Sequence, residues 1–151
     1  MTQVAAAFTR DANNVPIQGL GFTESKAISY SELTTGAVGI TSLFTVTGVV
    51  SIRVFGVCGN TLVGAATLEV GIVGSTASVL AQIADATTLA TDEIYTDATP
   101  TTKVEALPSE LIIGNGQDII QTIGSTAITS GQLTYYCLWF PISVNGNVVA
   151  A

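Results

Sequence analysis

Hydrophobic and polar residues alternate with a period of two in the middle of the chain. Side chains of a β-strand point alternately to its two faces, and residues 49–58 place Val50, Ile52 and Val54 together on one purely apolar face. Residues 40–47 alternate in the same way, and Gly48 stands between the two segments. Glycine within a strand pattern marks a bulge or a sharp kink. The pattern therefore predicts two consecutive strands within residues 43–59, bent at Gly48, as the centre of the domain.

A second apolar run, residues 132–142, is the predicted pairing partner of this centre. Alternation places Tyr135 and Trp139 on one of its faces and Tyr136 and Phe140 on the other. Aromatic residues dominate both cores and interfaces, and this split between two faces favours packing over a single exposed platform for stacking sugars. Because both runs are apolar on both faces, we expect one face to form the core and the other to meet another chain. The pattern leaves open which face does which.

Shorter strand patterns, separated by glycine and asparagine turns, account for most of the remaining chain. No stretch longer than about ten residues carries a helical stripe. We therefore predict an all-β fold, a single antiparallel β-sandwich of residues 23–151 with jelly-roll or other Greek-key topology. Residues 85–100 read as a polar surface loop around one short strand, and residues 78–83 fit either a strand or a helical turn. The other predicted strands are residues 23–30, 66–72, 104–113 (with Pro108 at an edge) and 118–123.

Residues 1–22 show no periodic element but are too apolar for a disordered tail. We interpret them as an extended N-terminal arm that lies on another surface, with a short edge strand and its loop in the same subunit as the alternative. The residues that favour a contact role are Phe8, Arg10, Val15, Pro16, Ile17, Leu20 and Phe22.

Composition limits what such a domain can bind. Charged residues make up 10% of the 151 residues, against about 25% in an average globular protein, and the mean hydropathy is +0.56. No apolar run approaches the roughly 20 residues of a membrane-spanning helix, so we expect an assembly that hides surface and no membrane partner. The first residues lack the basic region of a signal peptide, which favours synthesis and use in a cytoplasm.

Charge and residue types also argue against nucleic-acid binding and catalysis. The net charge is −7 with four cations, Arg10, Lys26, Arg53 and Lys103, too few and too scattered to neutralise phosphates. No histidine is present, which removes the usual catalytic triads and makes a zinc site unattractive. We therefore expect no enzyme activity, no cofactor and no metal. Cys58 and Cys137 lie in the two most apolar segments and are predicted to be buried free thiols.

Five stretches of the sequence resemble the head decoration, or cement, proteins of tailed phages. They read FTRDANNVPIQGLGFTESKAISY, LFTVTGVVSIRVFGVCG, GAATLEVGI, GQDIIQTIG and LTYYCLWFPISVNGNVVAA. The resemblance implies a virion protein on the capsid exterior, assembled in the host cytoplasm. It also implies an oligomer, often a trimer, that bridges neighbouring subunits of the major capsid protein.

On this interpretation the arm contacts the capsid or a neighbouring subunit, and outer strand faces form the oligomer. The interface residues that we expect are Arg53, Phe55, Val57, Tyr135 and Trp139. A lone cation on an apolar face requires a carboxylate, which a neighbouring chain could supply to Arg53. Two other functions stay open: a tail, fibre or head-spike adhesin that binds a receptor through residues 85–100, and a carbohydrate-binding β-sandwich module.

Overall fold

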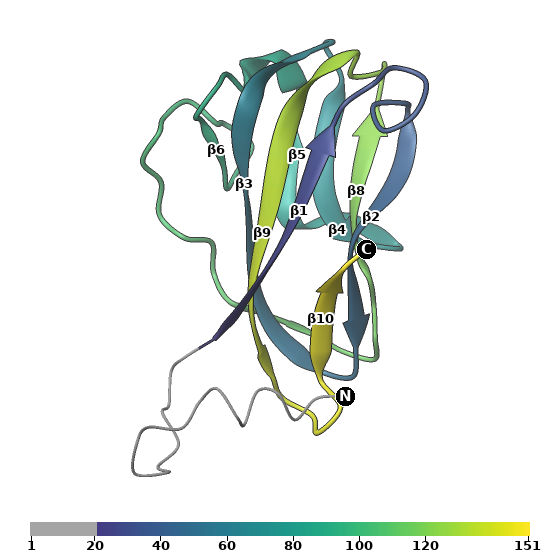
Figure 1. The fold of residues 1–151 in the computed structure, drawn as a ribbon, viewed down its shortest axis with the longest axis vertical. Coiled ribbons are helices and arrows are strands. Elements are labelled where there is room, and N and C mark those ends of the chain that lie inside the picture. The colour runs from purple at the N-terminus through teal and green to yellow at the C-terminus, as the bar shows by residue number, and fades with distance from the viewer. Residues whose placement is uncertain (1–20) are drawn as a thin grey trace.

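Two antiparallel sheets pack face to face in the computed structural model, which describes residues 21–151 (Figure 1). The front sheet contains β1 (Phe22–Ser29), β9 (Ser130–Pro141) and β3 (Val50–Val63), with the short strands β6 (Ile94–Tyr95) and β7 (Leu111–Ile113) on the far side of β3. The back sheet runs in the order β10 (Asn147–Ala150), β2 (Gly39–Thr47), β8 (Ile119–Gly124), β4 (Thr67–Ile72) and β5 (Ser75–Ile83). The predicted all-β sandwich is confirmed.

The order of the strands is that of a jelly roll. Strand pairs are nested: β1 pairs with β9, β2 with β8, β3 with β7, and β4 with β5. Two further pairings, of β3 with β9 and of β4 with β8, join these hairpins into the two sheets. This nesting is the product of rolling one long antiparallel hairpin into a double sheet. It selects the jelly roll from the Greek-key topologies that the sequence left open.

The predicted bend at Gly48 separates β2 from β3. Gly48 has φ +65°, in the left-handed region that favours glycine, and a Cβ there would collide with the side chains of Ser143 and Asn145. Beyond the bend, β3 runs antiparallel to β9 from the pair Val50–Pro141 to the pair Val63–Ser130. The predicted pairing of the two apolar runs is therefore confirmed.

The hydrophobic core lies between the sheets, and the face of β3 that was predicted to be its core face points into it. Val50, Ile52 and Val54 are at most 1% exposed. A β-bulge between Ser42 and Phe44 turns both Leu43 and Phe44 inward, so the strict alternation predicted for this strand is wrong at Leu43.

Several predicted boundaries shift in the structure. Strand β1 begins at Phe22, which makes this residue part of the sandwich rather than of the arm. The ambiguous residues 78–83 belong to β5, and only Leu111–Ile113 of the predicted strand 104–113 pairs with β3. The apolar stretch near residue 150 forms β10 against β2. No helix within residues 21–151 has the length and apolar character needed to cross a bilayer.

A polar residue of β8, Gln121, lies in the core with no solvent exposure. Its Oε1 atom accepts hydrogen bonds from the hydroxyls of Tyr30 (2.9 Å) and Tyr135 (3.1 Å). Its Nε2 atom is buried without a partner in the described part of the chain. Burial raises the pKa of both tyrosines far above the ordinary value, because a phenolate would be unsolvated there. The two hydroxyls therefore act as donors at any physiological pH.

Both cysteines are free and fully buried, as predicted. Loss of solvation raises the pKa of Cys58 to about 11 and that of Cys137 to about 12. Since the thiolate is the reactive form of cysteine, both thiols pack as small apolar groups.

Candidate interaction surface

The outward side of β3 and β9 carries a row of large apolar side chains. The strand register places Phe55 opposite Tyr136 and Arg53 opposite Leu138, so these side chains share one face. The rings of Phe55 and Tyr136 stack with centroids 5.3 Å apart and planes at 21°. We call this surface the aromatic face; it consists of Arg53, Phe55, Val57, Tyr136, Leu138 and Phe140. Its apolar members are only half-buried in this chain.

Tyr135 and Trp139, two of the predicted interface residues, do not belong to this face. They are 0% and 7% exposed, respectively, and point into the core. The register explains this orientation, because Trp139 is opposite Ile52, whose side chain is on the core face of β3. The prediction that they line an oligomer interface is therefore wrong. The predicted residues that do face outward are Arg53, Phe55 and Val57.

Arg53 has a carboxylate neighbour within its own chain. Its guanidinium lies 4.0 Å from Oε2 of Glu110, and the two side chains are 43% and 50% exposed. The other oxygen of Glu110 accepts a hydrogen bond from the Ser51 hydroxyl. Glu110 reaches this position because β7, which follows it directly, pairs with β3. A pair this open and this long contributes little stability, so Arg53 keeps donors for a further partner.

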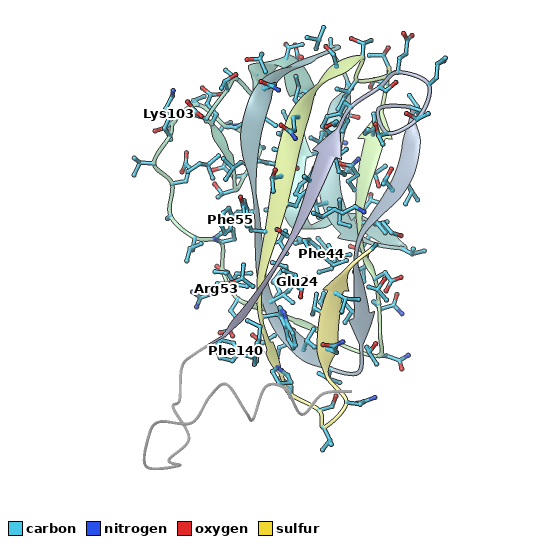
Figure 2. All side chains as sticks on the ribbon, viewed as in Figure 1. Glu24, Phe44, Arg53, Phe55, Lys103 and Phe140 are labelled. Carbon is cyan, nitrogen blue, oxygen red and sulfur yellow. The ribbon has the colours of Figure 1, made fainter. Side chains whose placement is uncertain are left out.

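A pocket of about 420 Å³ opens at the lower end of the aromatic face, where β1 begins. In Figure 2 the labels of Phe55, Arg53 and Phe140 follow one another down this side of the domain toward the pocket. Both apolar and polar residues line the pocket: Gly21, Phe22, Thr23, Ser51, Ile52, Arg53, Glu110, Leu138 and Phe140.

Further exposed apolar side chains lie near the same end. Ile112 is 70% exposed and points outward from β7 beside Ser51, which extends the aromatic face across a third strand. Ile142 and Val144, in the turn between β9 and β10, are 54% and 88% exposed. On the opposite side of the sandwich, the outward-facing side chains of β2 include the exposed threonines Thr45 and Thr47. The same outer surface also carries the exposed apolar side chains of Ile40 and Val149.

The polar residues 85–100 are fastened to the domain. A 3₁₀ helix at Ala86–Thr88 begins behind Asp85, whose carboxylate accepts hydrogen bonds from the backbone N–H (2.9 Å) and hydroxyl (2.7 Å) of Thr87. These bonds stabilise the ionised form and hold the pKa of Asp85 below its usual value. Leu89 and Tyr95 are 0% exposed. Within residues 21–151, no group of three or more Asp, Glu, Cys or His side chains is arranged to hold a metal ion.

Comparisons with known proteins do not assign this chain to a family. No protein-family model matches the sequence, and no curated protein matches it. Among solved structures it is similar to a chain of the cyanophage Pam1 capsid asymmetric unit, with 16% identity over 93% of this chain and 100% of that chain and a TM-score of 0.41. This likeness is too slight to assign a function.

The structure describes one of the predicted arm residues, Phe22. Phe22 is half-buried and packs against the core, with its ring centroid 4.9 Å from that of Trp139. The remaining arm residues, Phe8, Arg10, Val15, Pro16, Ile17 and Leu20, lie outside the described residues. Sequence reasoning missed three members of the aromatic face, Tyr136, Leu138 and Phe140. Alternation already places Tyr136 and Phe140 on the same face of their strand. Arg53 points outward, and the register of β3 with β9 puts its side chain on that same face. Together these two facts identify the face of Tyr136 and Phe140 as the outer one.

Proposed function

We propose that this chain is a structural virion protein that decorates and stabilises a bacteriophage capsid. In this proposal it bridges adjacent subunits of the major capsid protein from the capsid exterior, as a homotrimer. The role is mechanical and requires no catalysis. The observation that carries it is the aromatic face, an apolar surface spread over adjacent strands of the front sheet in a chain with few charges. The sequence resemblance to phage head decoration proteins supports the same conclusion.

The apolar side chains of the aromatic face are only half-buried in this chain. Contiguous apolar patches larger than a few hundred Å² are uncommon on monomeric proteins and mark interaction sites. Aromatic residues and arginine are enriched at interfaces, where they contribute most of the binding energy. The aromatic face presents Phe55, Tyr136 and Phe140 together with Arg53, which is only loosely paired. A standard interface buries about 800 Å² on each partner, and we propose that this face, with Ile112 beside it, contributes to that area.

Oligomerisation would explain how weak contacts could secure a capsid. A shell under internal DNA pressure fails where neighbouring subunits separate, and a trimer that contacts each neighbour ties them together. Once one contact forms, the others bind at high effective concentration, so avidity can exceed a single affinity by about 10²–10⁴-fold. The N-terminal segment, which enters the domain at Phe22 beside the pocket, is the proposed contact with the capsid or a neighbouring subunit.

The experiment compares two charge-insertion variants of the full chain. Phe55→Asp/Tyr136→Asp alters the aromatic face, whereas Thr45→Asp/Thr47→Asp adds the same charges to the exposed threonines of the opposite surface. Light scattering should show a trimer for the wild type and the threonine variant, and a folded monomer for the aromatic-face variant. A wild-type protein that is monomeric would remove the self-association part of the proposal.

Capsid binding is tested separately, by adding the purified wild-type protein to capsids of the phage that encodes it and imaging the particles. The expected result is additional density on the shell between capsid subunits. Density on a tail or fibre instead would support the adhesin alternative, and no bound density would overturn the decoration role.

A further inference from the structure

Two asparagines of the chain, Asn115 and Asn145, are followed directly by a glycine. Asparagine is a thermolabile residue, because the backbone nitrogen of the next residue can attack its side-chain amide carbon, Cγ. A glycine in the next position leaves this path open, since it has no side chain to hinder the approach and the backbone rotates freely there. The two sites therefore share the same local chemistry, and their surroundings in the fold distinguish them.

Asn145, in the turn between β9 and β10, is held from several sides. Its Oδ1 atom accepts a hydrogen bond of 2.8 Å from the Ser143 hydroxyl, and the N–H of Gly146 donates to the carbonyl of Ser143 over 2.9 Å. Gly146 is buried, and a Cβ on it would lie only 2.6 Å from the carbonyl oxygen of Val49. The side chain and the attacking nitrogen are thus both tied, and the backbone between them has little room to rotate.

Asn115 lies in an exposed turn between β7 and β8, with exposed glycines on both sides of it. Asn115 has φ +56° and Gly116 has φ +64°, and positive φ values of this kind are typical of tight turns that use asparagine and glycine. The N–H of Gly116 donates to the carbonyl of Gly48 over 3.1 Å. This hydrogen bond must break before the nitrogen can attack, but no buried residue of the turn has to move with it, because Gly114, Asn115 and Gly116 are all exposed.

We propose that Asn115 is a site of spontaneous deamidation, whereas the fold protects Asn145. When the turn opens, the nitrogen of Gly116 gives up its proton and attacks Cγ of Asn115. The new N–Cγ bond closes a succinimide ring as the Cγ–N bond of the side-chain amide breaks, and ammonia leaves with the proton. Water then opens the ring at either carbonyl, which leaves aspartate or isoaspartate in this position.

The product alters the contact between this turn and the bend at Gly48. Both products add a negative charge close in sequence to Asp118, whose carboxylate accepts a hydrogen bond of 3.0 Å from the N–H of Val46. Isoaspartate also lengthens the backbone, which displaces the N–H of Gly116 from the carbonyl of Gly48. The inference concerns the isolated chain and does not depend on the proposed capsid role, so it can fail or succeed independently of that role.

Incubation of the wild-type full chain in a warm, mildly alkaline buffer tests the proposal, with peptide mapping by mass spectrometry to follow each asparagine. In the folded protein, deamidation at Asn115 should be about tenfold or more faster than at Asn145, because the additional hydrogen bonds around Asn145 lower its reactive population by about that factor. In concentrated urea the two rates should converge, since only the local sequence then acts. Equal rates in the folded protein would overturn the proposal, and so would an equally large difference in urea.

A substitution next to the protected site shows whether the observed contacts provide the protection. Ser143→Ala removes the hydroxyl that holds Oδ1 of Asn145, so it should raise the rate at Asn145 severalfold and leave the rate at Asn115 unchanged. The matched control Ser109→Ala removes an exposed hydroxyl elsewhere and should change neither rate. Circular dichroism verifies that both variants are folded. A rate at Asn145 that Ser143→Ala does not change would refute the assigned protection.

Discussion

Replacing Gln121 by leucine should destabilise the domain, although leucine is the more apolar residue. In the wild type, Oε1 of Gln121 accepts from Tyr30 and Tyr135, which are 6% and 0% exposed. Gln121→Leu leaves two buried hydroxyls without their acceptor, at a cost of about 1–3 kcal/mol each. It also removes the buried Nε2 group, which has no partner among the described residues, and this returns about 1–3 kcal/mol. The expected net loss of unfolding free energy is about 1–3 kcal/mol.

The matched control is the triple variant Tyr30→Phe/Gln121→Leu/Tyr135→Phe. It removes every partner of the network at once, and such a replacement by apolar groups of similar shape can be nearly neutral. We therefore expect the triple variant to recover about 1 kcal/mol or more relative to Gln121→Leu alone. Urea denaturation measures both, with the fluorescence of Trp139, the single tryptophan of the chain, as the probe. Protein concentration must be held constant, because self-association would add to the apparent stability. A triple variant no more stable than Gln121→Leu would refute this account of the network.

Three further predictions follow from other parts of the domain. Trp139→Ala should lower the unfolding free energy by about 3–5 kcal/mol through loss of core packing, which urea denaturation followed by circular dichroism measures. If the alanine variant has wild-type stability but no longer binds glycans, the carbohydrate-binding alternative is supported instead. Because burial raises the pKa of both cysteines above 9.0, the stability that they contribute is complete below about pH 9 and decreases as the pH rises toward about 11 for Cys58 and about 12 for Cys137. Between about pH 9 and 10, the urea midpoint of Cys58→Ala/Cys137→Ala should therefore fall less than that of the wild type. The tyrosines, whose ordinary pKa is about 10, are present in both proteins and contribute equally, and equal slopes would contradict the assignment. Deleting residues 1–20 should leave a folded oligomer, because β1 begins at Phe22, but should weaken cosedimentation with capsids; unchanged capsid affinity would exclude the arm from the mechanism.

The centre of the fold could be predicted because its signals are local. Alternation identified the core face of Val50, Ile52 and Val54, and the bend at Gly48 followed from a glycine between two strand patterns. The bulge at Leu43 could not be predicted in this way, since it depends on how β2 aligns with β8, far along the chain. Sequence alternation alone also left the topology open, because it contains no information on which strands pair.

The candidate surface was predicted only in part, for a related reason. Alternation separated Tyr135 and Trp139 from Tyr136 and Phe140, but both pairs are aromatic, so composition could not show which pair faces outward. The register with β3 decides it by placing Trp139 opposite Ile52. The contact between Arg53 and Glu110 was equally hidden, because the irregular stretch before β7 brings the carboxylate to the face.

The nested strand pairing determines how early during its synthesis this protein can fold. Strand β1 leaves the ribosome first among the described strands, yet its partner is β9, whose residues 132–139 are made near the end. Strand β3 likewise waits for β9 along most of its length. Contacts between residues so far apart in sequence slow folding, and unpaired strand edges expose a nascent chain to aggregation. We therefore expect a chain that folds only after most of it has been translated, with the pairing of β9 between β1 and β3 as a late step that closes the front sheet.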